Sequence, residues 1–281
     1  MISIIIPTCN RNDLLSKCID ELSLRTKAGN SNLYEIIVTD DSKDGIAEHL
    51  VKSSYPGIKW VKGPAKGPAA NRNNGAKYAK GEWLLFIDDD CIPDGKMLSE
   101  YSEAIKAYNE TEVFEGFTGA DREKRSFVEE SPINETGGFL WSCNFMILKK
   151  LFDELNGFDV NFPFAAMEDV DLRYRIGQIG KQIKFIPTAR VIHPWRLEVN
   201  MLFKTKMRIQ SISYFLKKHP EMKKNLDALY FLKLSKNYFI DLIRNSLQYR
   251  FRGFHKQCLV CIMYLNFSMR LFINKSRGSL N

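Results

Sequence analysis

Three consecutive carboxylates stand directly after a short apolar stretch, Trp83–Ile87. Asp88, Asp89 and Asp90 repel one another, and they lose hydration if the stretch before them is a buried strand. Hard cations such as Mg²⁺ and Mn²⁺ take oxygen ligands and commonly bridge a few carboxylates to a substrate phosphate. We therefore favour a cation site over a solvated polar turn, because such turns seldom follow five apolar residues so directly.

A second acidic group occupies the start of a predicted helix near residue 168. Glu168, Asp169 and Asp171 precede apolar residues at helical spacing. Acids at a helix N-terminus are stabilised by the helix dipole, so they could serve as capping residues and nothing more. We expect Asp171 to face the helix interior, as a cap or as the partner of Arg173 or Arg175.

The elements that must position these acids alternate between strand and helix. Apolar runs of strand length span residues 2–6, 34–39, 58–61 and 83–87, and segments with helical spacing lie between them. Alternation of this kind predicts a parallel α/β sheet with crossover helices. Pro93 is expected to prevent the chain from continuing the sheet.

Polar side chains follow the carboxyl ends of these predicted strands. In parallel α/β sheets, ligands bind beyond those ends, where the strand order reverses. Asn10, Asp40, Asp41 and the three acids at 88–90 all stand there. Their convergence predicts a binding site at one edge of the sheet.

Further elements are predicted beyond the acidic triplet. A helix should run to about residue 109, followed by strands at 113–118, 139–148, 183–186 and 189–192, with a helical turn at 151–155 that Asn156-Gly157 ends. The polar segment 120–138 is long for a loop in a compact domain, and such loops are usually functional or mobile.

Composition sets outer bounds on function. The 281 residues carry a formal net charge of +8, which suits an anionic partner such as a nucleotide, a phospholipid surface or a nucleic acid. The six cysteines are scattered and no signal peptide precedes them, which predicts a reduced, cytoplasmic protein. Cys258 and Cys261 are interpreted as two apolar thiols on one helix turn. No stretch reaches the uninterrupted apolar length of a spanning helix, and residues 259–273 come nearest.

The composition changes near Leu197. From there to Asn274, Lys and Arg recur between apolar residues at helical spacings, and no convincing strand is present. We predict a domain at 1–196 and a basic amphipathic helical region at 197–281. Two interpretations of this region stay open: a helical cap with solvated basic residues, or a basic surface lying on anionic lipid.

Five segments, taken together and in this order, resemble the family 2 glycosyltransferases of GT-A fold. They are ISIIIPTCNR, EIIVTDDSKDG, GPAANRNNGAKYAKGEWLLFIDDDCIPD, NGFDVNFPFAAMEDVDLRYRIGQIGKQI and VIHPW. The second segment lacks the glycine that the family places between acid and serine. The resemblance runs from Ile2 to about Arg196, roughly two thirds of the chain.

The resemblance implies a mostly parallel, Rossmann-like sheet flanked by helices, followed by the helical region. It implies an inverting, hexosyltransferase-class enzyme that moves a sugar from a nucleotide-diphosphate sugar, by default a UDP-sugar, to an acceptor hydroxyl. A divalent cation, Mn²⁺ or Mg²⁺, would offset the charge of the leaving diphosphate. Family habit points to bacterial surface glycans of capsule or lipopolysaccharide type.

Roles for individual residues also follow from the resemblance. Asp169 matches the general base, with Glu168 as its neighbour and alternative, and we expect Asp169 to be ionised at neutral pH. Asp90 is the main metal ligand, with Asp88 and His193. Arg72 is expected beside Asp40 or Asp41, one of which accepts a hydrogen bond from the nucleotide base. The predicted nucleotide-sugar contacts are Pro7, Thr8, Asn10, Asp40, Asp41, Arg72, Asp88, Asp89, His193 and Arg196.

Partners and rivals complete the predictions. The donor is a nucleotide-sugar and the acceptor a glycan or a lipid-linked glycan; nucleic acid is not expected, and the oligomeric state, a dimer included, stays open. The protein is placed in the cytoplasm, with a peripheral position at the inner membrane face as an option. Trp141 could form a wall under a sugar ring, and Cys91 and Cys143 are interpreted as packing. The rivals are a nucleotidyltransferase acting on sugar phosphates and a non-catalytic, basic membrane-binding adaptor.

Overall fold

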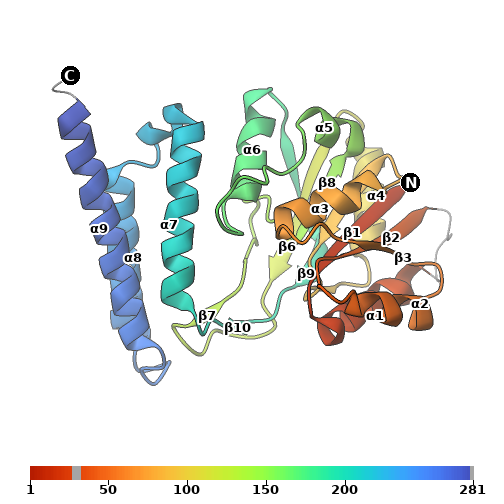
Figure 1. Ribbon diagram of the computed structural model, residues 1–281, viewed down its shortest axis with the longest axis horizontal. Helices are drawn as coiled ribbons and strands as arrows, with labels where there is room; N and C mark the ends of the chain where they lie inside the picture. Colours follow the sequence, from red (N-terminus) through yellow and green to blue (C-terminus); the bar gives the residue numbers. More distant parts are fainter. Residues whose placement is uncertain (27–32, 279–281) are drawn as a thin grey trace. The chain divides into compact units, whose positions relative to one another are not determined.

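The computed structural model describes residues 1–26 and 33–278. The chain forms two compact units, which we describe separately (Figure 1). The first unit comprises Met1–Asp121, Ser131–Asn161 and Glu168–Pro194, and the second comprises Arg122–Glu130, Phe162–Met167 and the chain from Trp195. The division of the chain into functional domains at residue 196 stays a prediction.

An eight-stranded mixed sheet forms the centre of the first unit. Its order is β3-β2-β1-β4-β8-β6-β9-β5. The pairs β1–β2, β2–β3, β1–β4 and β6–β9 are parallel, whereas β8 runs antiparallel to both β4 and β6. The predicted α/β class with a mostly parallel sheet is confirmed. The strands are β1 (Ile2–Thr8), β2 (Tyr34–Asp40), β3 (Lys59–Lys62), β4 (Trp83–Ile87), β5 (Ile92–Pro93), β6 (Val113–Gly119), β8 (Asn144–Leu148) and β9 (Ile183–Ile192).

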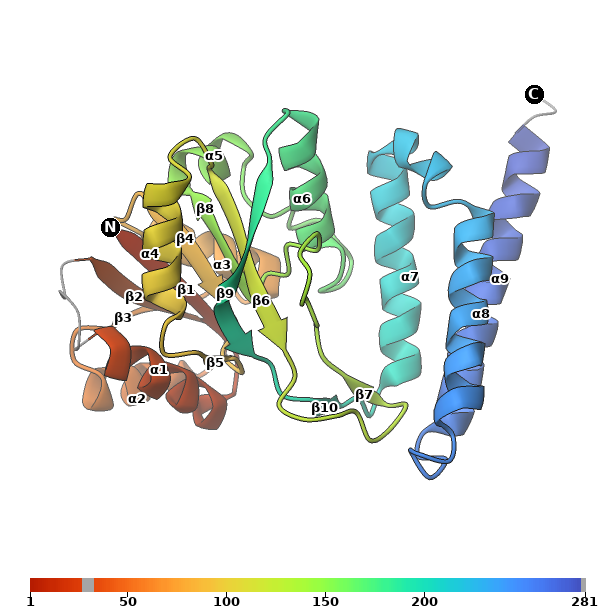
Figure 2. The same ribbon diagram turned by 180° about the vertical axis from the view of Figure 1, so that it is seen from behind.

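Helices cover both faces of this sheet (Figures 1 and 2). Successive strand residues point to opposite faces, so Ile4 and Ile6 pack under α1, α2 and α4, whereas Ile5 packs under α3, α5 and α6. All three side chains are fully buried, and each burial stabilises the fold by roughly 2 kcal/mol. The helices are α1 (Asn12–Thr26), α2 (Ile46–Ser54), α3 (Pro68–Lys77), α4 (Met97–Ala107), α5 (Lys149–Glu154) and α6 (Glu168–Gln178).

Two local predictions are wrong. Pro93 does not leave the sheet: with Ile92 it forms β5, which pairs with the end of β9. Proline is tolerated there because β5 is an edge strand. The two strands predicted at 183–186 and 189–192 are one strand, whose pairing with β6 shifts register between Gly116 and Phe117.

A buried glutamate explains why the strand predicted from residue 139 begins only at Asn144. The carboxylate of Glu115, 2% exposed, accepts hydrogen bonds from the backbone N–H groups of Gly138, Phe139 (3.1 Å) and Leu140 (2.8 Å). The side-chain amide of Asn134 donates to it as well, at 3.1 Å. Because these N–H groups are committed to Glu115, the segment forms a clamped loop instead of a strand.

The second unit is mainly helical. It contains α7 (Met201–Lys218), a 3₁₀ helix (Pro220–Lys224), α8 (Ala228–Asn245) and α9 (Phe254–Gly278), together with a two-stranded sheet of β7 (Glu129–Glu130) and β10 (Arg196–Leu197). Aromatic packing joins the helices: the rings of Tyr238 and Tyr264 stack at 5.6 Å. The Arg208 guanidinium on α7 lies 3.3 Å from the Glu130 carboxylate.

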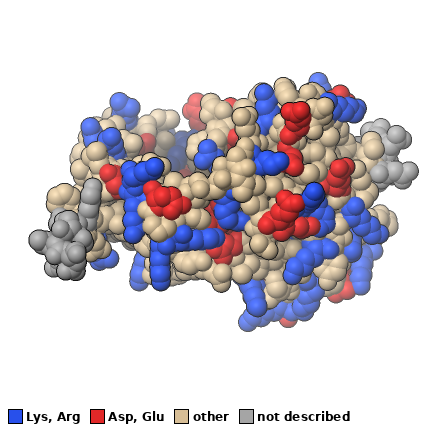
Figure 3. Space-filling model, turned by 90° about the horizontal axis from the view of Figure 1, so that it is seen from above, with Lys and Arg blue, Asp and Glu red and all other residues tan. Residues whose placement is uncertain are grey.

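The stretch Phe254–Asn274 of α9 is long and apolar enough to cross a membrane by length and composition, which the sequence did not lead us to expect. One such helix is weak evidence, because core helices of other proteins meet the same criterion. Charge is mixed on the face shown in Figure 3, where Lys and Arg side chains are interspersed with Asp and Glu.

The Glu115 clamp generates a stability prediction. Glu115→Gln replaces an acceptor oxygen with an NH₂ group that faces backbone donors, and we expect it to lower the free energy of unfolding by about 2–4 kcal/mol. Glu103→Gln is the control, because Glu103 makes only a surface pair with Lys106. Urea denaturation of both variants measures the difference. Equal midpoints in the two variants would contradict the clamp.

Candidate active site

The acidic triplet stands at the end of β4 and is held by residues from the end of β1. The Thr8 hydroxyl donates to Asp89 Oδ2 at 2.8 Å, and Arg11 Nη1 donates to Asp89 Oδ1 at 3.1 Å. Arg11 Nη1 also lies 3.9 Å from Asp90 Oδ2. Burial raises the pKa of Asp89, while Arg11 and Thr8 act against that rise. Sequence reasoning did not single out Arg11, although it directly follows Asn10 at the strand end.

A buried arginine joins the two acidic segments. Arg72 Nη2 lies 2.6 Å from Asp88 Oδ1, and Arg72 Nη1 lies 3.6 Å from Glu168 Oε1. The Arg72 side chain is 6% exposed and its guanidinium lies 5.7 Å from the centre of the Phe158 ring. The sequence led us to expect Arg72 beside Asp40 or Asp41; its ion pairs are instead with the triplet and with α6.

The second acidic segment begins α6. Met167, directly before it, has φ 77°, a left-handed conformation that is uncommon for a residue with a side chain. Burial and the charge of Asp169 raise the pKa of Glu168 to about 7. Burial likewise raises the pKa of Asp169 to about 6, although the N–H of Val170 donates to its Oδ1 at 2.8 Å. Desolvation therefore outweighs the helix-terminus effect that the sequence suggested.

Asp171 has the structural role predicted for it. Arg175 Nε donates to Asp171 Oδ2 at 2.7 Å, and the other guanidinium nitrogens donate to the carbonyls of Leu155 (2.6 Å) and Gly157 (2.7 Å). The turn at Asn156-Gly157, where both residues have positive φ, is thereby attached to α6.

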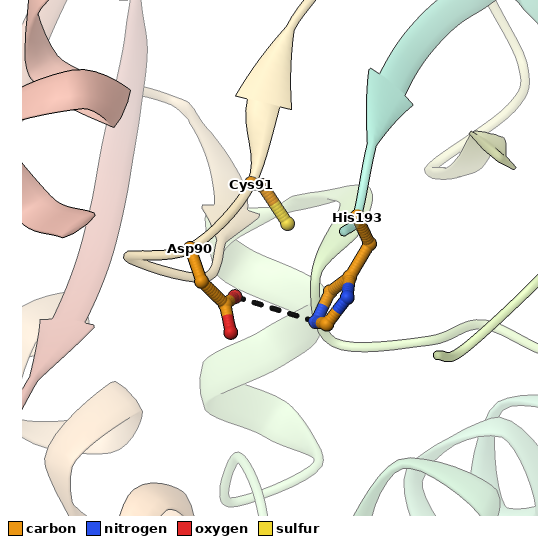
Figure 4. Close-up of side chains that lie close together, drawn as sticks. All are labelled: Asp90, Cys91 and His193. Carbon is orange, nitrogen blue, oxygen red and sulfur yellow. Dashed lines mark ion pairs between the residues drawn. The ribbon is translucent and has the colours of Figure 1, made fainter. Parts of the chain in front are cut away.

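Asp90 and His193 approach each other from the ends of different strands (Figure 4). His193 Nε2 lies 3.3 Å from Asp90 Oδ1, and both side chains are buried. His193 Nδ1 lies 3.1 Å from the carbonyl oxygen of Pro194, a pure acceptor, so Nδ1 carries a proton and Nε2 is directed toward Asp90. Cys91 Sγ belongs to the same group, whose ligand atoms all lie within 4.8 Å of one another.

The donor atoms of this group fit a hard divalent cation in part. Carboxylate oxygen and imidazole nitrogen are accepted ligands of Mn²⁺, and carboxylate oxygen is a ligand of Mg²⁺. Hydrogen bonding with Cys143 and burial raise the pKa of the Cys91 thiol well above its ordinary value, so Cys91 stays a neutral, soft group. Asp90 and His193 therefore suit the cation better than Cys91, which packs in the core with Cys143.

The two acids at the end of β2 differ in what their carboxylates hold. Asp40 is fully buried and accepts hydrogen bonds from Ser42 N (2.9 Å) and from Ala47 N (3.1 Å) in the first turn of α2. Asp41 is half-buried and accepts from Ala65 N (2.9 Å) and Gly67 N (3.1 Å), which shapes the loop before α3. Asp41 is thus the more accessible of the two candidates for contact with a ligand.

Helix α3 carries asparagines that sequence reasoning passed over. Buried Asn71 donates to the carbonyls of Thr39 (2.9 Å) and Thr8 (3.3 Å), which links the ends of β2 and β1. Asn73 donates to the carbonyl of Phe158 at 2.7 Å and accepts from its N–H at 2.9 Å. The segment Asn-Arg-Asn therefore positions three parts of the site. In the sequence, this run of polar residues was itself the only indication of that role.

The remaining predicted residues lie as follows. Pro7 is buried in β1, and Asn10 is exposed with φ 55° just beyond it. Arg196 belongs to β10 in the second unit, where it pairs in register with Glu130. Trp141 stacks on Phe139 at 5.3 Å, and its indole N–H donates to the carbonyl of Ile133.

The arrangement combines two chemical capacities in the first unit. The group at Asp90 and His193 could supply ligands for a divalent cation. The carboxylates of Glu168 and Asp169, whose pKa values burial raises toward neutrality, supply a proton acceptor. Arg72 pairs with Asp88, next to the first group, and with Glu168 in the second.

The sequence matches the family described as glycosyl transferase family 2 over residues 3–168. The chain belongs to this family, as its five motifs predicted. The matched region ends at Glu168 and thus contains the acidic triplet and most of the first unit.

Curated relatives are glycosyltransferases of several organisms. The poly(ribitol-phosphate) beta-glucosyltransferase of Bacillus spizizenii is 35% identical over 141 residues, which cover 47% of this chain and 22% of that protein. An uncharacterized glycosyltransferase of Haemophilus influenzae is 27% identical and covers 99% of both chains. The rhamnosyltransferase WbbL of Escherichia coli is 23% identical over 69% of this chain and 83% of its own. This chain thus spans about a fifth of the first of these relatives.

Solved structures share the fold. S. aureus TarS 1-349 superimposes with a TM-score of 0.55 at 14% identity, covering 98% of this chain and 91% of its own. GalNAc-T7, determined with UDP, GalNAc and Mn²⁺, gives a TM-score of 0.56 at 20% identity and covers 70% of this chain and 44% of its own. These likenesses establish the predicted GT-A fold.

The Arg72 bridge generates a pH-dependent stability prediction. Glu168 and Asp169 have folded-state pKa values above the ordinary ones, about 7 and about 6, so their deprotonation opposes folding as pH rises through those values. Arg72→Met removes the cation that limits this effect. We expect the melting temperature of Arg72→Met to lie slightly below that of the unsubstituted protein at pH 5 and further below it at pH 8.

Thermal unfolding without ligand, in buffers from pH 5 to pH 8, measures this dependence. Arg173→Met is the control, because Arg173 is an exposed arginine on α6, the helix that carries Glu168 and Asp169. A deficit in Arg72→Met that is the same at every pH would show that lost packing, and not the acid pair, is responsible.

Proposed function

We propose that this protein is a metal-dependent inverting glycosyltransferase that moves a sugar from a nucleotide-diphosphate sugar to an acceptor hydroxyl. The observation that carries the proposal is the meeting of three groups at the strand ends: Arg72 pairs with Asp88 and Glu168, and His193 approaches Asp90. Membership in glycosyl transferase family 2 supports the reaction class.

The metal, Mn²⁺ or Mg²⁺, would be held by Asp90 and His193, with Asp88 as a further proposed ligand. When bound it offsets the negative charge that the leaving nucleoside diphosphate gains. The chain's own residues prepare the place: Pro194 orients the His193 ring, and Arg11 lies between Asp89 and Asp90. The Mn²⁺ in the GalNAc-T7 structure supports this assignment by analogy of fold only.

Asp169 is the proposed general base. An acceptor hydroxyl needs a carboxylate that is ionised at working pH yet basic enough to take its proton. A pKa of about 6, raised by burial, meets both requirements at neutral pH. Glu168 has the higher pKa and its carboxylate lies 3.6 Å from the Arg72 guanidinium, so we assign it the positioning of Arg72.

The nucleotide is proposed to lie along the ends of β1 and β2. Asp41 is preferred over Asp40 for the base, because the Asp40 carboxylate already caps α2. Gly63 lies close against this edge, where there is no room for a side chain: a Cβ there would lie 2.2 Å from Asp41 Oδ1. UDP is the proposed carrier, supported by the UDP complex of TarS 1-349. Pro7, Thr8 and Asn10 are the remaining proposed contacts on this side.

The acceptor is proposed to be a bacterial surface glycan, free or lipid-linked. Relatives support this class: an O-antigen biosynthesis protein of Myxococcus xanthus, and a Campylobacter jejuni enzyme named for a substrate on diphospho-undecaprenol. The protein would act in the cytoplasm at the inner membrane face.

Exposed apolar residues on α8 and α9 are the proposed contact with that membrane. Phe239 is 55% exposed and Ile243 67% exposed, one helix turn apart on α8. Exposed apolar surface marks interaction sites, and the Lys and Arg residues of the same helices favour anionic lipid. Further exposed apolar residues on these two helices are Leu229, Leu232, Leu259, Ile262, Met269 and Phe272.

The general base gives the most direct test of the chemistry. Asp169→Asn keeps the shape of the side chain and removes the proton acceptor, so transfer should fall by roughly 10²-fold or more while UDP-sugar affinity stays near that of the unsubstituted protein. In the unsubstituted protein, transfer should decline as pH falls through about 6, the pKa of Asp169. The transfer rate of the variant and the pH dependence of transfer are both measured by nucleoside diphosphate release, with a donor found by screening nucleotide-sugars.

Glu168→Gln is the matched comparison. Transfer that survives in Asp169→Asn and is lost in Glu168→Gln would move the base by one residue. Full activity in both variants would refute the mechanism.

Membrane contact predicts a loss of vesicle binding in Phe239→Asp/Ile243→Asp. Sedimentation with anionic liposomes at low and high salt measures it, because surface attraction is screened by salt. Val199→Asp is the control, since Val199 is 74% exposed and lies outside both helices. If the α8 variant pellets as well as the control, the apolar face has another partner, such as a second copy.

A further inference from the structure

The second unit contains an arginine-lined cavity of about 400 Å³ that none of the roles above uses. Arg122 and Arg125 line it from the segment before β7, and Arg252 lines it from the turn between α8 and α9. A volume in this range suits a small ligand or the head group of a larger one. Leu197, 68% exposed, adds an apolar edge.

The cavity carries an excess of positive charge. Its single carboxylate, Glu129, is held by Arg122 Nη2 at 2.7 Å and by the backbone N–H of Arg125 at 2.6 Å. Burial acts to raise the pKa of Glu129, but these hydrogen bonds outweigh it and leave the pKa below its ordinary value. Three arginines, whose guanidinium groups stay charged at any physiological pH, thus line the cavity together with this carboxylate.

The two segments are held together by contacts that do not involve the guanidinium groups. The carbonyl of Arg252 accepts hydrogen bonds from Phe127 N (3.0 Å) and from the Ser126 hydroxyl (3.1 Å). Gly253 has φ 81°, and a Cβ there would lie 2.6 Å from Val128 Cγ1. The backbone therefore brings Arg125 and Arg252 to one cavity while their exposed side chains stay available to a ligand.

We propose that this cavity binds a phosphate or diphosphate group, with Arg125 and Arg252 as its principal contacts. Guanidinium groups recognise phosphate by paired, charge-assisted hydrogen bonds, and Arg is the residue best suited to that geometry. The apolar edge at Leu197 is compatible with a phosphate carried on a lipid chain. The identification of this group as part of the acceptor rests on the proposed glycosyl transfer; the binding of phosphate does not.

Calorimetry on the full chain tests the site, with inorganic pyrophosphate and farnesyl diphosphate as probes. Buffer with chelator removes divalent cations, so the metal-dependent nucleotide site does not compete for diphosphate. Arg125→Ala/Arg252→Ala should bind both probes about tenfold or more weakly, as loss of two charge-assisted contacts implies. Arg244→Ala/Arg270→Ala removes the same charge from exposed positions on α8 and α9 and should bind as the unsubstituted protein does.

The outcomes show whether the site binds phosphate and, if it does, whether that phosphate is carried on a lipid. Tighter binding of farnesyl diphosphate than of pyrophosphate assigns the site to a lipid-borne group, and equal binding assigns it to phosphate itself. Equal weakening in the two double variants, or no binding of either probe to the unsubstituted protein, overturns the site. Binding of UDP with Mn²⁺, measured in parallel, reports on the nucleotide site separately, so failure of the proposed function is distinguished from failure of this inference.

Discussion

The site depends on one buried guanidinium group, which lies between two acidic segments whose carboxylates would otherwise repel each other. Arg72 pairs with Asp88 after β4 and with Glu168 at the start of α6, and its side chain is almost fully buried. Without that charge, five carboxylates would stand close together in partly desolvated surroundings, and several would take up protons at neutral pH. The Arg72 charge lowers the pKa values of Glu168 and Asp169 and so acts against the burial that raises them to about 7 and about 6.

The fold supplies the geometry that this pairing requires. Parallel strands β2, β1 and β4 end at the same edge of the sheet, so the acids that follow them converge. Helix α3 then carries Arg72 across that edge, and Asn71 and Asn73 on either side attach the helix to the strand ends and to Phe158. A single helical turn thus contacts the ends of β1 and β2, the acidic triplet and the turn at Phe158.

Much of this was predictable from the sequence, and the exceptions have physical reasons. The apolar runs before Asp40 and Asp88 predicted the strands and the edge at which the acids lie, because strand length and termination are local properties. The ion pairs of Arg72 were not foreseen, since an ion pair between residues 72 and 168 depends on how α6 returns to the sheet. Arg11 was missed because its contact with Asp89 depends on the pairing of β1 with β4, and the rise in the pKa of Asp169 was missed because burial is not a local property.

We propose that Asp90 and His193, next to the carboxylates that Arg72 joins, hold a divalent cation together with a nucleoside diphosphate. Electron paramagnetic resonance of Mn²⁺ tests it most directly, because the signal of the free aqueous ion decreases when the ion is bound. With the unsubstituted protein, the signal should fall strongly on addition of UDP, and much less with Asp90→Asn, which lacks the charged ligand paired with His193. A free-ion signal that UDP leaves unchanged, or that falls equally in Asp90→Asn, would contradict the account.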